Sequence, residues 1–270
     1  MKKPLVSVLM PAYNAEKYIV EAIESILDQT YKNFELIIAD DLSTDKTWNI
    51  ICNYKKIDNR IIAIKNKKNL YIAGNRNKLL SLAKGEYIAW QDADDISYRK
   101  RLERQVKFME KNKDVGICGG YLDFYFNGKV IERRRYSKLD SRLRRRIFRQ
   151  SPVAQPASII KKECFDKVGL FDLNYPPAED IDMSFRIGSY YKLANISFPL
   201  IKYRLHYKSA TSQKLKLIML TTLKIRFKNI NNKAYRFSLV DIVYQIATVC
   251  ALLLPPLLVY YTFRKYRRIV

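Results

Sequence analysis

The sequence predicts an α/β fold in which a mostly parallel central sheet is flanked by helices and followed by a C-terminal helical extension. Up to about residue 95, short apolar runs alternate with segments whose apolar residues recur at helical spacing. This alternation is typical of parallel strands joined by helical crossovers. Polar residues follow several runs, at the sheet edge where α/β proteins bind ligands. The chain is basic and apolar near its end, so we predict an α/β domain over 1–210 and a helical segment over 211–270.

The first strand is predicted over residues 5–10, a continuous apolar run typical of a strand buried on both faces. The turn that follows contains Asn14, and asparagine is a common helix cap. Apolar residues then recur at helical spacing over 15–29, which predicts the first helix.

The same alternation continues toward the middle of the chain. A second strand is predicted over 34–39, followed by a helix over 46–54. A third strand over 61–64 and a helix over 73–83 come next. Residues 87–90 follow a glycine and are aromatic and aliphatic, so they form the fourth predicted strand.

Three carboxylates, Asp92, Asp94 and Asp95, come directly after this fourth strand. Like charges this close repel one another unless a cation joins them, and carboxylate oxygens suit Mg²⁺ or Mn²⁺. The pattern alone also fits a solvated acidic turn that caps the next helix. No glycine-rich dinucleotide motif and no phosphate-binding P-loop appear in the sequence.

The net charge is +24, and two stretches carry most of it. Residues 129–149 hold ten basic and two acidic residues, and residues 202–270 hold fourteen basic residues and one acidic residue. Basic stretches of this kind suit nucleic acid or an anionic membrane surface.

The four cysteines are far apart and the chain has one histidine, so we expect reduced thiols and a cytosolic compartment. The N-terminus leads directly into the first predicted strand, and we expect no cleaved signal peptide.

Several motifs, in order and spacing, resemble family 2 glycosyltransferases of the GT-A fold. They are VSVLMPAYN (6–14), SILDQTY (25–31), DDLSTD (40–45), NRN (75–77), DADD (92–95), AEDIDMSFR (178–186) and YRLH (203–206). The resemblance covers about residues 4–210, and its specificity comes from the motifs occurring together rather than from any one of them.

The resemblance implies a nucleotide-sugar site at the strand ends. Pro11, Tyr13 and Asn14 would line it, and Asp41 would accept a hydrogen bond from the base unless it only caps the following helix. Arg76 would add positive charge near the base or the diphosphate.

The remaining motif residues would serve the ribose and the phosphates. Asp92 would contact the ribose, and Asp94 would hold the Mn²⁺ or Mg²⁺ that bridges the two phosphates. His206 would be a third metal ligand or a diphosphate contact, with a purely structural role as the alternative. Asp95 would be a supporting or helix-capping residue.

For the chemical step the resemblance implies that Asp180 is the general base of an inverting transfer, with Glu179 as the alternative base. Both residues precede a helical run, where carboxylates also favour the helix dipole. Leu42 and the segment 70–75 depart from the family pattern and would alter the donor pocket. The Q-x-x-R-W motif of processive synthases is absent, which favours addition of a single sugar.

In the basic stretch 129–149, Leu139, Leu143 and Ile147 recur every four positions. This spacing predicts a basic amphipathic helix that rests on lipid phosphates, or simply a solvated charged face.

Residues 242–263 carry no charge but contain Pro255 and Pro256, and a basic cluster follows them. We expect two short helices in the cytoplasmic leaflet, with Tyr260, Tyr261 and Tyr266 at the interface, rather than a membrane span. A dimerisation hairpin is the alternative.

The sequence therefore predicts a metal-dependent inverting glycosyltransferase at the cytoplasmic face of the cell membrane. It would transfer one sugar from a nucleotide-sugar donor, for which we expect UDP, to a lipid-linked or surface-glycan acceptor in polysaccharide or lipopolysaccharide assembly. A basic nucleic-acid-binding protein is the second hypothesis, and the acidic cluster argues against it. A catalytically silent scaffold is the third, and the presence of Asp94 and Asp180 argues against it.

Overall fold

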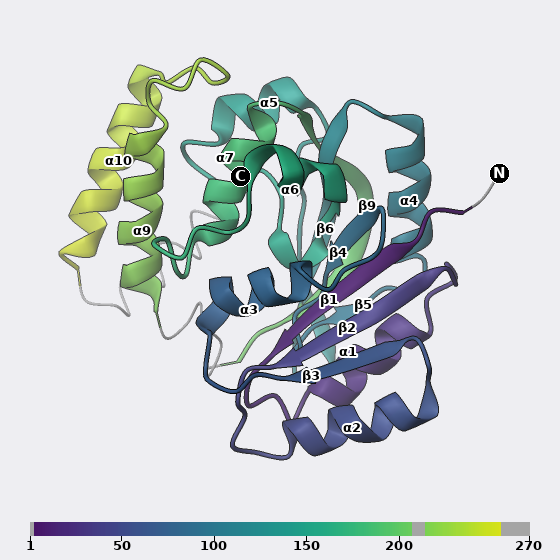
Figure 1. Ribbon diagram of the computed structural model, residues 1–270. Coiled ribbons are helices and arrows are strands. Elements are labelled where there is room, and N and C mark those ends of the chain that lie inside the picture. Colours follow the sequence, from purple (N-terminus) through teal and green to yellow (C-terminus); the bar gives the residue numbers. More distant parts are fainter. Residues whose placement is uncertain (1–2, 207–213, 255–270) are drawn as a thin grey trace.

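The computed structural model describes residues 3–206 and 214–254, which build one nine-stranded sheet covered by helices on both faces (Figure 1). The strands are β1 (Val6–Ala12), β2 (Phe34–Asp40), β3 (Ile61–Lys65), β4 (Tyr87–Trp90), β5 (Ile96–Ser97), β6 (Val115–Phe126), β7 (Lys129–Arg134), β8 (Ile159–Lys161) and β9 (Lys192–Arg204). The helices are α1 (Ile19–Leu27), α2 (Thr47–Ile57), α3 (Tyr71–Leu80), α4 (Arg101–Lys111), α5 (Asp140–Arg146), η1 (Gln155–Ala157), α6 (Lys162–Val168), α7 (Glu179–Gly188), α9 (Leu215–Lys228) and α10 (Leu239–Leu252).

The sheet has the order β3-β2-β1-β4-β8-β6-β9-β5, and β7 pairs with β6. The first four strands of this order are parallel, as predicted. The rest of the sheet is mixed, because β8 runs antiparallel to both of its neighbours and β5 runs antiparallel to β9. The chain leaves β1 toward β2 and later returns to place β4 on the other side of β1. The carboxyl ends of β1 and β4 thus form a topological switch point, where ligands of α/β sheets bind.

The core forms one apolar layer on each face of the sheet, because successive strand residues point to opposite faces. On one face, Val8 and Met10 of β1 pack with α1, α2 and α4. On the other, Leu9 packs in the layer that contains α3, α5, α6 and α7. Figure 1 shows the parallel half of the sheet between α1 and α2 on one side and α3 on the other.

Helix α1 begins at Ile19, later than predicted, and Asn14 does not cap it. The residue at its N-cap is Tyr18, which makes no capping hydrogen bond. The Asn14 side chain instead accepts a hydrogen bond from the Thr44 backbone N–H at 2.9 Å, and Asn14 has a positive φ of 47°. Asn14 therefore joins the loop after β1 to the loop after β2. The next predicted strands and helices lie within three residues of the observed bounds.

The prediction of one amphipathic helix over 129–149 is wrong. Residues Lys129–Arg134 form β7, which pairs antiparallel with β6, and the helix α5 spans only Asp140–Arg146. Leu143 and Ile147 are fully buried in the apolar core, whereas Leu139 is exposed. Two of the three apolar positions of the predicted helix thus face the protein core rather than lipid.

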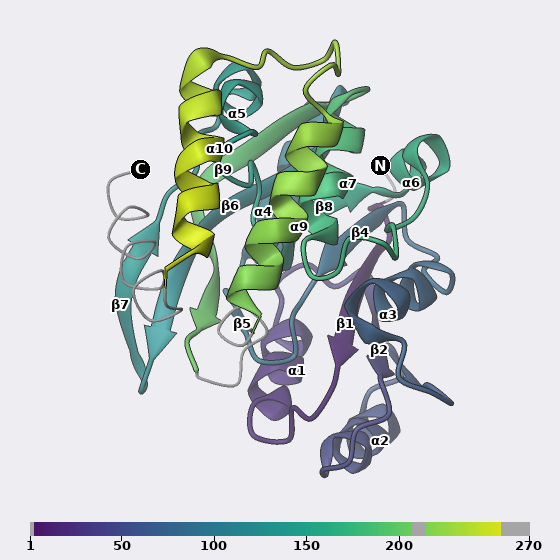
Figure 2. The same cartoon turned by 90° about the vertical axis from the view of Figure 1, so that its left-hand side faces the viewer.

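Helices α9 and α10 lie side by side outside the helix layer of the sheet, and α9 packs against α7 (Figures 1 and 2). The Gln245 side chain on α10 donates a hydrogen bond to the Phe148 carbonyl at 2.7 Å, and Asp241 pairs with Arg149 at 2.9 Å. A reciprocal capping box between Ser238 and Asp241 starts α10.

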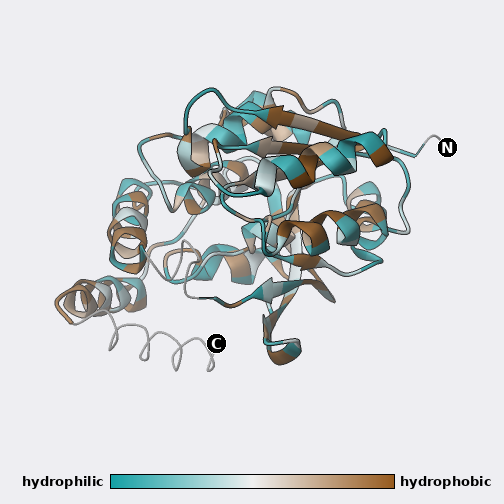
Figure 3. Ribbon diagram, turned by 90° about the horizontal axis from the view of Figure 1, so that it is seen from below, coloured by the Kyte–Doolittle hydropathy of each residue, from teal (hydrophilic) through white to brown (hydrophobic). Residues whose placement is uncertain are grey.

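The outer side of α10 is apolar, and Figure 3 shows hydrophobic residues where this helix borders the molecule. Its exposed apolar residues are Leu239, Val240, Ile242, Val243, Ile246 and Val249. Among the described residues, no helix is both long and apolar enough to cross a membrane. The predicted helix break at Pro255 and Pro256, and the tyrosines at 260, 261 and 266, lie outside the described residues.

Candidate active site

The acidic loop after β4 gathers Asp92, Asp94 and Asp95, each of which offers a carboxylate oxygen within 4.8 Å of the others. The Gln91 side chain holds the loop in shape by donating hydrogen bonds to the carbonyls of Asp92 (3.0 Å) and Asp95 (2.8 Å). Helix α4 begins later, at Arg101, with Lys100 at its N-cap. The aspartates therefore do not cap this helix, and they form a compact acidic site at the switch point.

Arg101 supports this loop from inside the protein. Its side chain is fully buried, and its guanidinium donates to the Trp90 carbonyl at 2.6 Å and to the Gln91 side-chain oxygen at 3.1 Å. The Ser97 hydroxyl accepts a further hydrogen bond at 2.9 Å. Arg101 cannot be recognised as a site residue from the sequence, because an arginine at the start of an amphipathic helix resembles an ordinary surface charge. Its one signal is its spacing with Gln105, which lies one turn later and accepts from the Arg101 Nε.

The end of β9 places His206 and Arg204 against the acidic loop. His206 Nε2 lies 2.8 Å from Asp94 Oδ2, and the imidazole packs against the Tyr18 ring with centroids 4.9 Å apart. The Arg204 backbone N–H donates to Asp95 Oδ1 at 2.8 Å, and its Nε donates to the Asp94 carbonyl at 2.9 Å. The motifs at 92–95 and 203–206, which are far apart in the sequence, thus form one site.

Arg76 on α3 forms an ion pair with Glu179 and does not extend freely into the site. Its Nη1 lies 2.7 Å from Glu179 Oε1, and its Nη2 lies 3.9 Å from Asp92 Oδ1. The guanidinium lies 5.3 Å from the Trp90 ring centroid and 5.7 Å from that of Phe171. Asn77 holds Phe171 in place through both of that residue's backbone groups. The Arg76 charge is therefore shared between Glu179 and Asp92.

Glu179 and Asp180 form the first turn of α7, where both carboxylates also favour the helix dipole. Glu179 is 2% exposed, and its burial raises the pKa of the carboxyl to about 7 against the opposing effect of Arg76. Burial also raises the pKa of Asp180, again opposed by Arg76. Because Arg76 contacts both Glu179 and Asp92, it joins the turn of α7 that carries Asp180 to the acidic loop.

The acidic loop fits a divalent cation. Desolvation in the cleft, with the neighbouring charges of Asp94 and Asp180, raises the pKa of Asp92 to about 6 despite the charge of Arg76. Burial, Asp94 and Asp92 likewise raise the pKa of Asp95 well above its ordinary value. Asp95 Oδ2 is buried and has no hydrogen-bond partner among the described residues. Carboxylate oxygens that lie this close and repel one another suit Mg²⁺ or Mn²⁺.

Asp41 lies at the end of β2 and is buried. Its Oδ1 accepts hydrogen bonds at 2.8 Å from the Asn66 side chain and from the Leu70 backbone N–H. Asn66 also donates to the Asn75 side chain at 3.0 Å. Helix α2 begins at Thr47 with Lys46 at its N-cap, so Asp41 does not cap it. The asparagines that orient Asp41 were not recognised as site residues from the sequence.

The motif at 6–14 contributes Pro11 and the exposed ring of Tyr13 to the site. Pro11 lies within β1 opposite Ala39, and Tyr13 is 52% exposed just beyond the strand. Asn14 is used to join two loops, as described above. The other predicted site residues lie near the carboxyl ends of the strands, except for Arg76 on α3 and for Glu179 and Asp180 at the start of α7.

The family model "Glycosyl transferase family 2" matches residues 7–169. An uncharacterized glycosyltransferase of Methanocaldococcus jannaschii is 38% identical over 237 residues, which cover 85% of this chain and 81% of the relative. The Escherichia coli UDP-Glc:alpha-D-GlcNAc-diphosphoundecaprenol beta-1,3-glucosyltransferase WfaP is 44% identical over 127 residues, which cover 47% of this chain and 49% of WfaP.

Among solved structures, the chain resembles the mannosyltransferase PcManGT of Pyrobaculum calidifontis in complex with GDP-Man and Mn²⁺. The TM-score is 0.67 at 17% identity, and the match covers 96% of this chain and 72% of that one. The fold agrees over nearly the whole chain, and the family model covers more than half of it. The chain therefore belongs to family 2 of the glycosyltransferases, and it is a glycosyltransferase with the GT-A fold.

Proposed function

We propose that this enzyme transfers one sugar from a UDP-linked donor to a hydroxyl of a lipid-linked or surface-glycan acceptor, with a divalent cation and with inversion at the anomeric carbon. The observation that carries the proposal is the convergence of Asp92, Asp94 and His206 at one edge of the sheet. Arg76 joins this edge to the first turn of α7, which carries Asp180. WfaP, which uses UDP-Glc and a lipid-linked acceptor according to its name, supports the choice of donor and acceptor class.

For the donor, we assign the base to Asp41 and the ribose to Asp92. The Asn66 and Leu70 donors occupy one oxygen of the Asp41 carboxylate and thereby fix its direction. A fixed acceptor of this kind reads an imide N–H of uracil. Arg76 remains paired with Glu179 and close to Asp92. It therefore affects the donor by positioning these two carboxylates.

Asp94 and His206 would hold Mn²⁺ or Mg²⁺, and the cation would neutralise the diphosphate that departs. The chemistry of the donor set and the 2.8 Å contact between these residues support this assignment. Arg204 and Asp95 fix the loop that carries Asp94.

Asp180 accepts the proton of the acceptor hydroxyl as that oxygen attacks the anomeric carbon. A base works best when its pKa lies near the working pH, and burial moves the pKa of Asp180 upward in that direction. Glu179 is the weaker candidate for the base, because its Oε1 is already bound by Arg76.

We further propose that the segment 211–270 associates with the cytoplasmic face of the cell membrane, where polysaccharide or lipopolysaccharide precursors are built. The exposed apolar side of α10 and the basic composition of the segment support this. The same apolar side also suits a homodimer, and vesicle sedimentation together with the oligomeric state in solution distinguishes the two.

The direct test is release of nucleoside diphosphate from UDP-, GDP- and dTDP-sugars, with Mn²⁺, Mg²⁺ or EDTA. We expect turnover of a UDP-sugar only with metal, and no turnover by Asp94→Ala or Asp180→Asn. Asp180→Asn should still bind UDP. Binding without turnover, even with detergent-solubilised membrane lipids as acceptor, would indicate a silent scaffold. If no nucleotide sugar binds, the proposal is overturned, and the hypothesis of a nucleic-acid-binding protein is favoured instead.

A further inference from the structure

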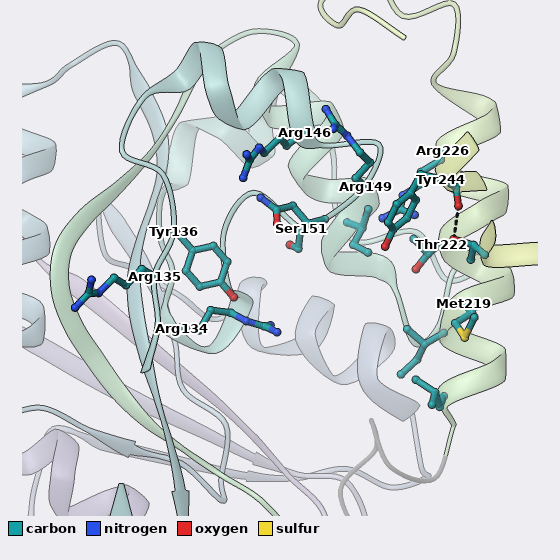
Figure 4. A pocket seen from close by; sticks show the side chains of 15 residues that line it. Arg134, Arg135, Tyr136, Arg146, Arg149, Ser151, Met219, Thr222, Arg226 and Tyr244 are labelled. Carbon is teal, nitrogen blue, oxygen red and sulfur yellow. Dashed lines mark hydrogen bonds between the residues drawn. The ribbon is translucent and has the colours of Figure 1, made fainter. Parts of the chain in front are cut away.

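A cavity of about 310 Å³ lies between the end of β7, the segment after α5 and the α9–α10 pair (Figure 4). Its walls include Arg134, Arg135, Arg146, Arg149, Arg226 and Ile181. We call this the arginine pocket. Asp41, Asp92 and Asp94 are not among its walls, so it is separate from the donor and metal residues.

The arginine pocket is strongly positive. Five arginines line it, and none of its lining residues is acidic. Arg149 is paired with Asp241 on α10, and the 4% exposed Arg226 donates to Gln245 at 3.3 Å. Figure 4 shows Arg134 extended toward the helices, whereas Arg135 points the opposite way. Arginines gathered around one cavity match a phosphate, because their planar donors bind its oxygens in pairs.

The opposite wall of the pocket is apolar. Helix α9 contributes Leu215, Ile218 and Met219 to this wall. Beyond the wall, Leu217 and Leu220 of the same helix are exposed, as are Val243 and Ile246 on α10. A ligand that uses both walls carries a phosphate next to a hydrocarbon chain.

The pocket also touches the catalytic helix. Ile181 lines the pocket, and it directly follows Asp180 in the first turn of α7. Consecutive Cα atoms lie about 3.8 Å apart. The Thr221 hydroxyl on α9 approaches the Pro176 carbonyl, just before this turn, at 3.5 Å. A group bound against Ile181 therefore contacts the turn of α7 that carries the residue assigned as the base.

We propose that the arginine pocket binds the phosphate of the acceptor, and that the acceptor is a sugar joined through phosphate to a long hydrocarbon chain. This rests on the function proposed above and narrows it, because a neutral surface glycan would leave the arginines without a ligand. The phosphate lies among the arginines, the sugar hydroxyl reaches Asp180, and the chain follows the apolar surface of α9 and α10.

The test is calorimetric binding of farnesyl diphosphate, in EDTA so that a metal site cannot bind the diphosphate. Farnesol tests the apolar part alone, and inorganic pyrophosphate tests the anion alone. The variant is Arg134→Ala/Arg146→Ala, and the matched control is Arg145→Ala, an exposed neighbour on α5 that does not line the pocket.

We expect farnesyl diphosphate to bind more tightly than pyrophosphate or farnesol. The double variant should bind farnesyl diphosphate at least about 10-fold more weakly than the wild type, because each substitution removes a charge-assisted hydrogen bond. Arg145→Ala should bind it like the wild type. Equal binding by the double variant and the control would overturn the proposal. The proposal would also be overturned if the double variant bound farnesyl diphosphate like the wild type but no longer bound vesicles of one-third phosphatidylglycerol in phosphatidylcholine. That result would make the pocket a site for lipid headgroups.

A second measurement separates this proposal from the proposed function. UDP binding with Mn²⁺ should be unchanged in Arg134→Ala/Arg146→Ala and lost in Asp94→Ala. If UDP binding is lost in the arginine variant, the pocket belongs to the donor and the acceptor assignment is wrong. If the wild type binds farnesyl diphosphate through the arginines but turns over no nucleotide sugar, the pocket stands and the enzyme proposal falls.

Discussion

Arg76 on α3 and Glu179 at the start of α7 form a buried ion pair, with Nη1 and Oε1 2.7 Å apart. The pair joins the donor side of the site to the helix that carries Asp180. Because Trp90 and Phe171 flank the guanidinium, water cannot readily replace either partner. The geometry of the site therefore depends on this contact.

Arg76→Met should lower the free energy of unfolding by about 3–5 kcal/mol, because it leaves the Glu179 carboxylate buried without its cation. Adding Glu179→Gln should restore part of this loss, since the amide carries no charge. Urea unfolding measures both effects. The control is Arg99→Met, which breaks the exposed pair with Asp28 and should change stability by less than about 1 kcal/mol. Equal losses in Arg76→Met and Arg99→Met would contradict the prediction.

Glu179 should make stability depend on pH. Its pKa is raised from 4.5 to about 7 in the folded protein, so between these values the folded state holds more protons than the unfolded state. The free energy of unfolding contributed by this group therefore falls as the pH rises from about 4.5 to 7. Urea unfolding at several pH values in EDTA should show that Glu179→Gln gains stability over the wild type as the pH rises. The exposed Glu86→Gln variant should keep the wild-type slope, and a parallel slope in Glu179→Gln would refute the assignment.

His206→Gln should weaken Mn²⁺ binding about 10-fold or more, and Asp94→Asn should abolish it, because the two side chains meet at 2.8 Å. Electron paramagnetic resonance of free Mn²⁺ measures the affinity directly, without a sugar donor. Tyr18→Leu keeps the imidazole and removes only the ring packed against it, so it serves as the control. If His206→Gln binds Mn²⁺ like the wild type, His206 has a structural role.

Arg101→Met should destabilise the protein by about 3 kcal/mol or more, because the Trp90 carbonyl and the Gln91 side chain lose a buried donor. Arg101→Lys should not rescue it, since one ammonium group cannot reach all the acceptors of a guanidinium. Thermal and urea unfolding report the loss. Lys100→Met, at the exposed preceding residue, is the control and should unfold like the wild type. Rescue by lysine would show that only the charge matters.

Asn66→Ala should weaken UDP binding about 10-fold, because Asp41 loses the amide that orients its carboxylate. Calorimetry with UDP and Mn²⁺ measures this, and the exposed Asn53→Ala provides the control. The Mn²⁺ affinity itself should not change, because Asn66 lies at the β2 end of the site. If both affinities fall together, the loss reflects general disruption rather than the orientation of Asp41.

Local sequence patterns were sufficient for the parallel half of the sheet and for the acidic loop. The strand at 87–90 and the three aspartates after it are contiguous, so a buried run followed by charge identifies both. Asp41, Asp180 and His206 were found because their motifs resemble a known family, not because their spacing requires one site. Asn14 was misread as a cap because a short-range preference cannot reveal its partner, Thr44, on another loop.

Tertiary structure alone determined which site residues contact one another. Arg76 and Glu179 are 103 residues apart, and His206 and Asp94 are 112 residues apart, so no local pattern pairs them. The stretch 129–149 has helical spacing, but pairing with β6 makes its first part a strand, and burial of Leu143 turns the apolar side inward. The arginine pocket likewise exists only because α9 and α10 fold back beside β7. The sequence by itself determined which elements form and which chemical groups end them. Long-range packing determined which of those groups meet, because free energy is gained only once distant side chains are buried together.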